Sequence, residues 1–121
     1  MKLSVHFSRQ EFACKCGCGF DTVDAELIDA LEDVRMHFMA PVVINSSCRC
    51  LEHNESVGGA KNSQHTKGRA ADIVVKGVSP DDVYDYLNKK YSGEYGIGKY
   101  NSFTHIDTRS GVSARWDFSD K

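Results

Sequence analysis

Two histidines and one aspartate in this chain have the types and spacing that a metal-binding site needs. His65 and Asp72 belong to the segment SQHTKGRAAD, and His105 belongs to the later segment FTHID. Two imidazoles and one carboxylate that converge on a zinc ion leave its fourth tetrahedral position open, as in catalytic rather than structural zinc sites. Taken singly, each residue is more often an ordinary core or surface side chain. The prediction of a zinc site with His65, Asp72 and His105 as ligands therefore depends on the combination.

The backbone around these residues is suited to bringing them together. Gly68 permits a sharp turn after His65, so that the strand that follows can return Asp72 to the same metal ion. Side chains two residues apart in a strand point to the same face of a sheet. His105 and Asp107 are therefore expected to serve one site.

The elements that must position these residues are helices mixed with short strands. Apolar residues recur at helical spacing between Asp24 and Phe38, and Ser79 followed by Pro80 is typical of a helix start. The expected elements are a helical turn at residues 8–11, a helix at 24–38, strands at 42–44 and 70–75, a helix from residue 80 to 91, and strands at 103–108 and 112–116. This pattern predicts an α+β domain with a small antiparallel sheet flanked by helices.

Length and composition fit a single domain, residues 1–121, and disfavour several classes of partner. With 121 residues and 40% hydrophobic content, the chain can bury one modest core. A formal net charge of −2 and a pI of about 6.2 provide no basic stripe for nucleic acid. No stretch is apolar enough to span a bilayer, and the first residues lack the apolar run of a signal peptide. We expect a monomer that is made in a cytoplasm and has no nucleic-acid or membrane partner.

Five cysteines fall in two tight groups. Cys14, Cys16 and Cys18 form the first group, and Cys48 and Cys50 form the second. An odd number of cysteines without a signal peptide argues against a complete disulfide framework. A second, structural zinc ion at these thiols is an alternative, but one intervening residue is fewer than the usual two to four. A plain cysteine-bearing loop is the favoured interpretation.

Beyond these spacings, the sequence resembles the D-Ala-D-Ala zinc carboxypeptidase family. The matching segments are SSCR at 46–49, Asn54, the glycine pair at 58–59, SQH at 63–65, GRAAD at 68–72 and HID at 105–107. The resemblance extends from Phe7 to Trp116 and is strongest to short single-domain members from bacteriophages and prophages. The family is similar in turn to the metal sites of Hedgehog domains and vancomycin-resistance dipeptidases. The resemblance implies a Hedgehog/DD-peptidase-like fold with His65, Asp72 and His105 as the zinc ligands.

The same resemblance implies an activity. A zinc metallopeptidase of this type would hydrolyse amide bonds in bacterial peptidoglycan without a covalent intermediate, as a D,D-carboxypeptidase or an endopeptidase. It would act as a phage or prophage endolysin released through a holin-type membrane lesion, or as a lysin carried on the virion. The alternatives are a non-catalytic, metal-containing phage tail or cell-wall binding module, and a cytoplasmic dipeptidase that acts on D-Ala-D-Ala.

The identity of the general base stays open at this point. In several related cell-wall peptidases the base is a carboxylate three residues before the last histidine ligand, but Ser102 occupies that position here. Asp107 is the candidate base, with the alternative that it only orients His105 through a hydrogen bond. A further alternative makes Asp107 the third ligand and His105 the catalytic imidazole, because relatives with a His-x-His motif bind metal through its second residue.

Three residues are candidates for binding substrate. Arg49 follows the strand expected at 42–44 and can form a bidentate pair with a carboxylate, which recognition of a peptide ending in D-alanine requires. Ser63 and Gln64 precede His65 and are candidates for orienting it or for binding the substrate backbone. The alternatives are a solvated arginine and ordinary polar loop residues.

Overall fold

Five strands form one sheet in the computed structural model, and helices pack on it. The structure describes residue 4 and residues 6–14, 23–47, 54–55, 65, 68–109 and 113–118. The elements are, in chain order, the 3-10 helix η1 (Arg9–Phe12), helix α1 (Ala25–Phe38), strands β1 (Val42–Ser46) and β2 (Ala70–Val75), helix α3 (Pro80–Lys90), and strands β3 (Gly96–Lys99), β4 (Thr104–Asp107) and β5 (Ala114–Asp117). No helix in these ranges is long and apolar enough to cross a membrane.

The strand order is β1-β2-β4-β3-β5, which confirms the predicted α+β class. The β1/β2, β2/β4 and β3/β4 pairs are antiparallel, whereas β5 runs parallel to β3. The sheet is therefore mixed rather than wholly antiparallel. The reason lies in the chain path, because a strand that reverses direction after β4 runs parallel to β3. It lies at the edge beside β3 because both sides of β4 are already paired.

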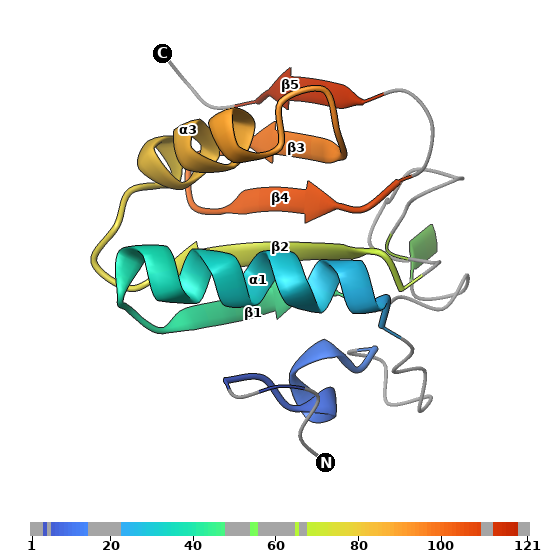
Figure 1. Ribbon diagram of the computed structural model, residues 1–121. Coiled ribbons are helices and arrows are strands. Elements are labelled where there is room, and N and C mark those ends of the chain that lie inside the picture. The colour runs from blue at the N-terminus through green and yellow to red at the C-terminus, as the bar shows by residue number, and fades with distance from the viewer. Residues whose placement is uncertain are drawn as a thin grey trace.

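Helices α1 and α3 lie on one face of the sheet (Figure 1), and their sequences explain why they form. In α1 the apolar positions recur at helical spacing, and Leu27, Leu31 and Val34 are fully buried. In α3 the Ser79 hydroxyl accepts a hydrogen bond from the Asp82 backbone N–H at 3.2 Å, as expected for an N-cap. The predicted helical turn at residues 8–11 is also present as η1, with both bonds of a capping box.

The two faces of the sheet have different roles. The face toward the helices carries the core residues of the strands, including Ile73 of β2, Ile97 of β3 and Ile106 of β4. Because side chains alternate along a strand, the opposite face carries Asp72 of β2 and His105 and Asp107 of β4. The candidate site lies on this second face, away from the hydrophobic core.

Strand β3 is absent from the sequence-based expectations. Its sequence, Gly-Ile-Gly-Lys, has low strand propensity because glycine has no side chain to pack on a sheet. The structure gives the reason for both glycines. A Cβ on Gly96 would lie 2.5 Å from Oδ2 of Asp107, and a Cβ on Gly98 would overlap the indole of Trp116. The glycines of β3 therefore leave room for side chains from the neighbouring strands.

Candidate active site

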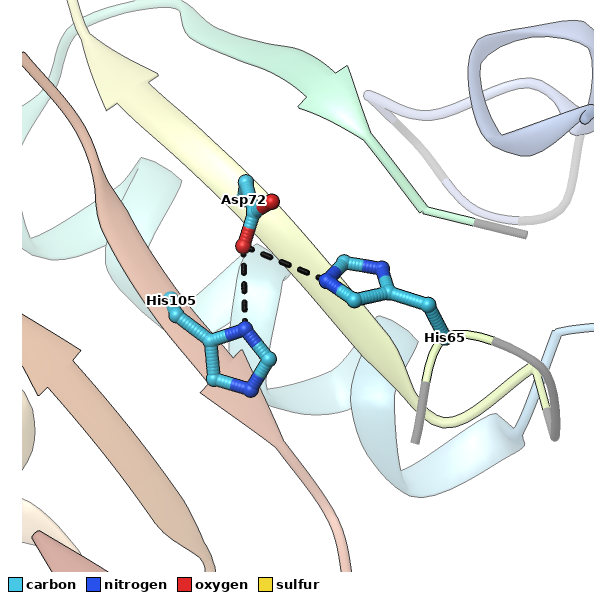
Figure 2. Close-up of side chains that lie close together, drawn as sticks. All are labelled: His65, Asp72 and His105. Carbon is cyan, nitrogen blue, oxygen red and sulfur yellow. Dashed lines mark hydrogen bonds and ion pairs between the residues drawn. The ribbon is translucent and has the colours of Figure 1, made fainter. Parts of the chain in front are cut away.

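Three buried side chains converge at the middle of the sheet (Figure 2). One oxygen of Asp72, Oδ1, lies 2.9 Å from Nδ1 of His105 and 3.3 Å from Nε2 of His65. One ligand atom from each residue lies within 4.8 Å of the others, and all three residues are less than 9% exposed. The predicted ligand candidates His65, Asp72 and His105 thus lie together.

Strand pairing brings two of these residues together. Asp72 of β2 and His105 of β4 are direct partners in the antiparallel register, so their side chains stand next to each other on one face. Asp107 lies on the same face of β4, as the two-residue spacing predicts. It is not part of the three-residue cluster around Asp72.

The turn before β2 brings in the third residue. Gly68 adopts a φ of 70°, a conformation that L side chains rarely adopt, and its N–H donates to the carbonyl of His65 at 3.4 Å. The backbone N–H of Asp24, at the start of α1, donates to the Gly68 carbonyl at 2.9 Å. Thr108, just after β4, donates its hydroxyl to the carboxylate of Asp24 at 2.7 Å. The turn is therefore fastened both to α1 and to the end of β4.

In His65 and in His105, one ring nitrogen donates a hydrogen bond to an acceptor outside the three-residue cluster. Nδ1 of His65 donates to the backbone carbonyl of Ser47 at 2.7 Å, and the Ser47 hydroxyl donates to the Ala70 carbonyl at 2.6 Å. Nε2 of His105 donates to Oδ2 of Asp107 at 2.7 Å. The ring nitrogens that remain, His65 Nε2 and His105 Nδ1, are the ones that face Asp72 and would be available to a metal ion.

The electrostatics of the cluster favour a charged carboxylate. Burial by itself would raise the pKa of Asp72, but the hydrogen bonds from His105 and His65 outweigh it and hold the pKa well below its usual value. Burial would likewise lower the pKa of His105, but the hydrogen bonds to Asp107 and Asp72 outweigh it and raise the pKa. Two imidazoles directed at one buried carboxylate are an arrangement that a cation would stabilise.

The donor atoms fit a zinc ion in type and in spacing. Two imidazole nitrogens and one carboxylate oxygen are a common zinc ligand set. Zinc binds nitrogen at about 2.0–2.1 Å, so atoms at two corners of its tetrahedron lie about 3.3 Å apart. His65 Nε2 and Asp72 Oδ1 are separated by 3.3 Å, and His105 Nδ1 is slightly closer to the carboxylate at 2.9 Å. Two of the three ligand pairs therefore lie near the separation that a zinc ion needs.

Every acceptor position of the Asp107 carboxylate has a donor. Oδ2 accepts from His105 Nε2 and from Arg109 Nη2, each at 2.7 Å. Oδ1 accepts from Arg109 Nε at 2.7 Å and from the Arg109 backbone N–H at 3.2 Å. The Asp107 side chain is 0% exposed. A carboxylate has about four lone-pair sites, so this one has none left for a water molecule.

The side chain of Trp116 packs against the His105 ring. Trp116 of β5 is the register partner of Gly98, and Gly98 is the register partner of His105. With no side chain on Gly98, the indole extends toward the imidazole of His105, and the two ring centroids are 5.0 Å apart. The Arg109 guanidinium lies over the same indole at 5.4 Å, and the indole N–H donates to the Tyr100 hydroxyl at 2.9 Å.

Some of the predicted site residues can be located and others cannot. Arg49, Ser63 and Gln64 lie outside the described residues, as do Cys16, Cys18, Cys48 and Cys50. Cys14 is buried. Ser102 is exposed before β4. The substrate-binding and structural-zinc predictions therefore stay predictions.

Among the residues that the structure describes, sequence reasoning missed Ser47, Arg109 and Trp116, which contact the metal ligands or Asp107. A signal for Arg109 existed, because the two-residue alternation that links His105 to Asp107 also includes residue 109. Trp116 is the single tryptophan of the chain, but its proximity to His105 depends on the parallel pairing of β5 with a glycine-containing strand. Ser47 acts through its backbone carbonyl, and the residue type carries no signal for that contact.

Replacing Gly98 with alanine is expected to disturb the site through Trp116. The new methyl group would overlap the rigid indole, and overpacking of this kind costs about 1–3 kcal/mol of unfolding free energy. Displacement of the indole should also weaken zinc binding, measured by competition with a chromophoric chelator. Gly77→Ala is the control, because Gly77 has a φ of 78° and open space around it. It should lower stability without changing zinc affinity, and an equal zinc affinity in the two variants would contradict the expectation.

Comparison with known proteins assigns the chain to a family, in agreement with the observed fold. The chain belongs to the Peptidase M15 family, whose model matches residues 5–107. It is 29% identical over 118 residues to a protein of Escherichia coli K12 named peptidoglycan L,D-endopeptidase MepK, with 92% of this chain and 62% of the relative covered. The Shigella flexneri protein of that name matches equally. A probable MepK of Haemophilus influenzae is 33% identical over 64 residues, covering 53% of this chain and 34% of the relative. The chain thus spans 62% of the Escherichia coli relative.

Proposed function

We propose that this chain is a zinc-dependent peptidase that hydrolyses amide bonds in bacterial peptidoglycan. The observation that carries the proposal is the buried cluster of His65, Asp72 and His105, with two ring nitrogens directed at one carboxylate oxygen. Membership of the Peptidase M15 family supports it. The names of the relatives favour an endopeptidase, which cuts internal bonds of peptidoglycan peptides, over a carboxypeptidase.

Three residues would hold the ion, and two others orient the histidine ligands. His65 Nε2, Asp72 Oδ1 and His105 Nδ1 would hold zinc, which would polarise the scissile carbonyl and lower the pKa of a water molecule. The Ser47 carbonyl fixes the orientation of the His65 ring through Nδ1. The carboxylate of Asp107 does the same for His105 through Nε2. Burial of the ligands excludes competing water from their hydrogen bonds.

We assign Asp107 to the orienting role rather than to the role of general base. Four donors occupy its two oxygens, and its side chain is fully buried. A general base must reach the proton that it removes, directly or through one water molecule. Burial alone would raise the pKa of Asp107, but hydrogen bonds from Arg109 and His105 outweigh it and hold the pKa well below its usual range. A carboxylate in that state is a poor proton acceptor.

Digestion of purified peptidoglycan tests the function directly. The zinc-loaded chain should release soluble peptides that mass spectrometry identifies, and incubation with a chelator should abolish their release. Adding zinc back should restore it. Fragments cut at internal bonds would support the endopeptidase assignment, and loss of a terminal residue alone would favour a carboxypeptidase. No release of peptides with zinc, cobalt or manganese would contradict the proposal.

A non-catalytic binding module is a second candidate function. The observation that favours it is the lack of a carboxylate at the expected base position, where Ser102 stands, together with the saturation of Asp107. Such a module would bind peptidoglycan and retain zinc without releasing fragments. Co-sedimentation of the chain with intact sacculi, combined with the digestion assay, separates the two candidates.

Several finer expectations remain predictions of this proposal. Arg49, Ser63 and Gln64 are the candidate substrate-binding residues, and an unchanged KM in Arg49→Ala would contradict the arginine's role. A phage or prophage origin, release through a membrane lesion, and a monomeric state also stay predictions. Two zinc ions per chain instead of one would support the structural site at the cysteines.

A further inference from the structure

The arginine beside the metal cluster has a geometry that is more specific than charge neutralisation requires. Arg109 donates two parallel hydrogen bonds of 2.7 Å to the two oxygens of Asp107, and its backbone N–H donates a third of 3.2 Å. Bidentate pairs of this kind fix the plane of a carboxylate as well as its position. Because Oδ2 of Asp107 also accepts from His105 Nε2, the plane of the carboxylate determines where the imidazole points.

The guanidinium group of Arg109 also contacts an aromatic ring. Its Cζ atom lies 5.4 Å from the centre of a Trp116 ring, within the range of a cation–π contact. The same indole lies 5.0 Å from the His105 ring, so it limits rotation of both side chains. Trp116 is itself held by the hydrogen bond from its ring N–H to the Tyr100 hydroxyl.

Two glycines of β3, separated by one residue and therefore on the same face of the sheet, leave space for this arrangement. Gly96 lies beneath the Asp107 and Arg109 side chains, where a Cβ would come within 2.5–2.6 Å of both. Gly98 lies beneath the indole of Trp116. Arg109 and Trp116 both lie beyond residues 5–107, the stretch that the family model matches.

We propose that Arg109 and Trp116 are positioning residues of the metal site, which hold Nδ1 of His105 toward the ion. Arg109 acts through Asp107, and Trp116 acts on the guanidinium and directly on the imidazole. This inference rests on the proposed zinc site. Arg109 holds the carboxylate, Trp116 holds the guanidinium and the imidazole, and neither touches the ion. Loss of either side chain should weaken zinc binding even though all three ligands, His65, Asp72 and His105, remain.

A double-mutant cycle that measures zinc affinity tests whether Arg109 acts through Asp107. The variants are Arg109→Gln, Asp107→Asn and the pair combined, with the zinc Kd measured by competition with a chromophoric chelator. Removing a group that orients a metal ligand typically weakens binding by about 10–100-fold, and Arg109→Gln should fall in that range. Arg109→Lys should recover part of the loss, because lysine restores the charge but not the bidentate geometry. In the Asp107→Asn background, Arg109→Gln should have little further effect, since independent effects would multiply.

Two further measurements separate positioning from a purely structural role. Arg35→Gln, which removes the same charge from α1, is the matched control and should leave the Kd unchanged. The visible spectrum of the cobalt-substituted protein should change in Arg109→Gln and in Trp116→Leu, because the ligand geometry changes. Variants that lower the melting temperature but keep the wild-type Kd and cobalt spectrum would overturn the proposal.

The buried Asp107 carboxylate would lose its ion-pair partner in Arg109→Gln, and this variant can fail to fold for that reason alone. In that event Trp116→Leu decides, since it leaves the ion pair intact. A rise in its zinc Kd of about tenfold supports the proposal, and an unchanged Kd overturns it. A wild-type chain that binds no zinc would overturn the proposed function as well, whereas wild-type binding with unaffected variants would overturn only the positioning role.

Discussion

Replacing His105 with alanine is expected to abolish zinc binding and to reduce peptidase activity by about a thousandfold or more. The variant removes one of three ligands and leaves Asp72 with a single imidazole partner. Electrophilic stabilisation by a bound metal is worth several kcal/mol, and each ~1.4 kcal/mol corresponds to a tenfold change in rate. Zinc content by mass spectrometry under native conditions and peptide release from peptidoglycan are the two measurements.

The control for this variant is His37→Ala. His37 is an exposed histidine near the end of α1 that stacks on Tyr86 and lies outside the metal cluster. It should keep both zinc and activity. If His105→Ala retained a full equivalent of zinc with wild-type affinity, His105 would not be a ligand, and the assignment of the site would have to change.

The second large effect is expected from Asp107→Asn. Asparagine replaces one of the two acceptor oxygens with an NH2 donor, which would face either His105 Nε2–H or Arg109 Nε–H, so that a donor would face a donor. If its amide nitrogen faced His105, it would favour a proton on Nδ1, the atom assigned to the metal. We expect the zinc Kd to rise by about 10–100-fold, with much of the activity recovered at saturating zinc.

The same variant distinguishes the two roles that the sequence allows for Asp107. A general base contributes about 10²–10⁴-fold to the rate, and its loss would not be repaired by more zinc. An unchanged zinc Kd combined with a rate loss of that size would therefore contradict the orienting role. Asp29→Asn, at an exposed position of α1, is the matched control and should behave as the wild type.

Much of the fold was predictable because its signals are local. The apolar spacing of α1, the Ser79 cap and Pro80 at the start of α3, and the apolar run of β2 each specify one element without reference to the rest of the chain. The convergence of His65, Asp72 and His105 was also predictable. It required only a turn at Gly68 and two neighbouring strands.

The features that were missed depend on contacts between distant segments. Strand β3 is built from residues that disfavour strands, and its glycines make sense only when the side chains of Asp107, Arg109 and Trp116 lie above them. The parallel edge strand β5 follows from the direction of the chain after β4, which local propensity does not encode. The pair of Asp107 and Arg109 was missed for a related reason, because the hydrogen bonds between them depend on the path of the chain after β4.

The anomalous scattering of a crystal of the zinc-loaded chain, measured at the zinc edge, tests the central claim most directly. We predict one peak within about 2.0–2.2 Å of His65 Nε2, Asp72 Oδ1 and His105 Nδ1, with Asp107 bonded to the far nitrogen of His105. A peak bound by Asp107 in place of His105 would contradict this ligand assignment. The absence of any peak between β2 and β4 at full zinc loading would contradict the site itself.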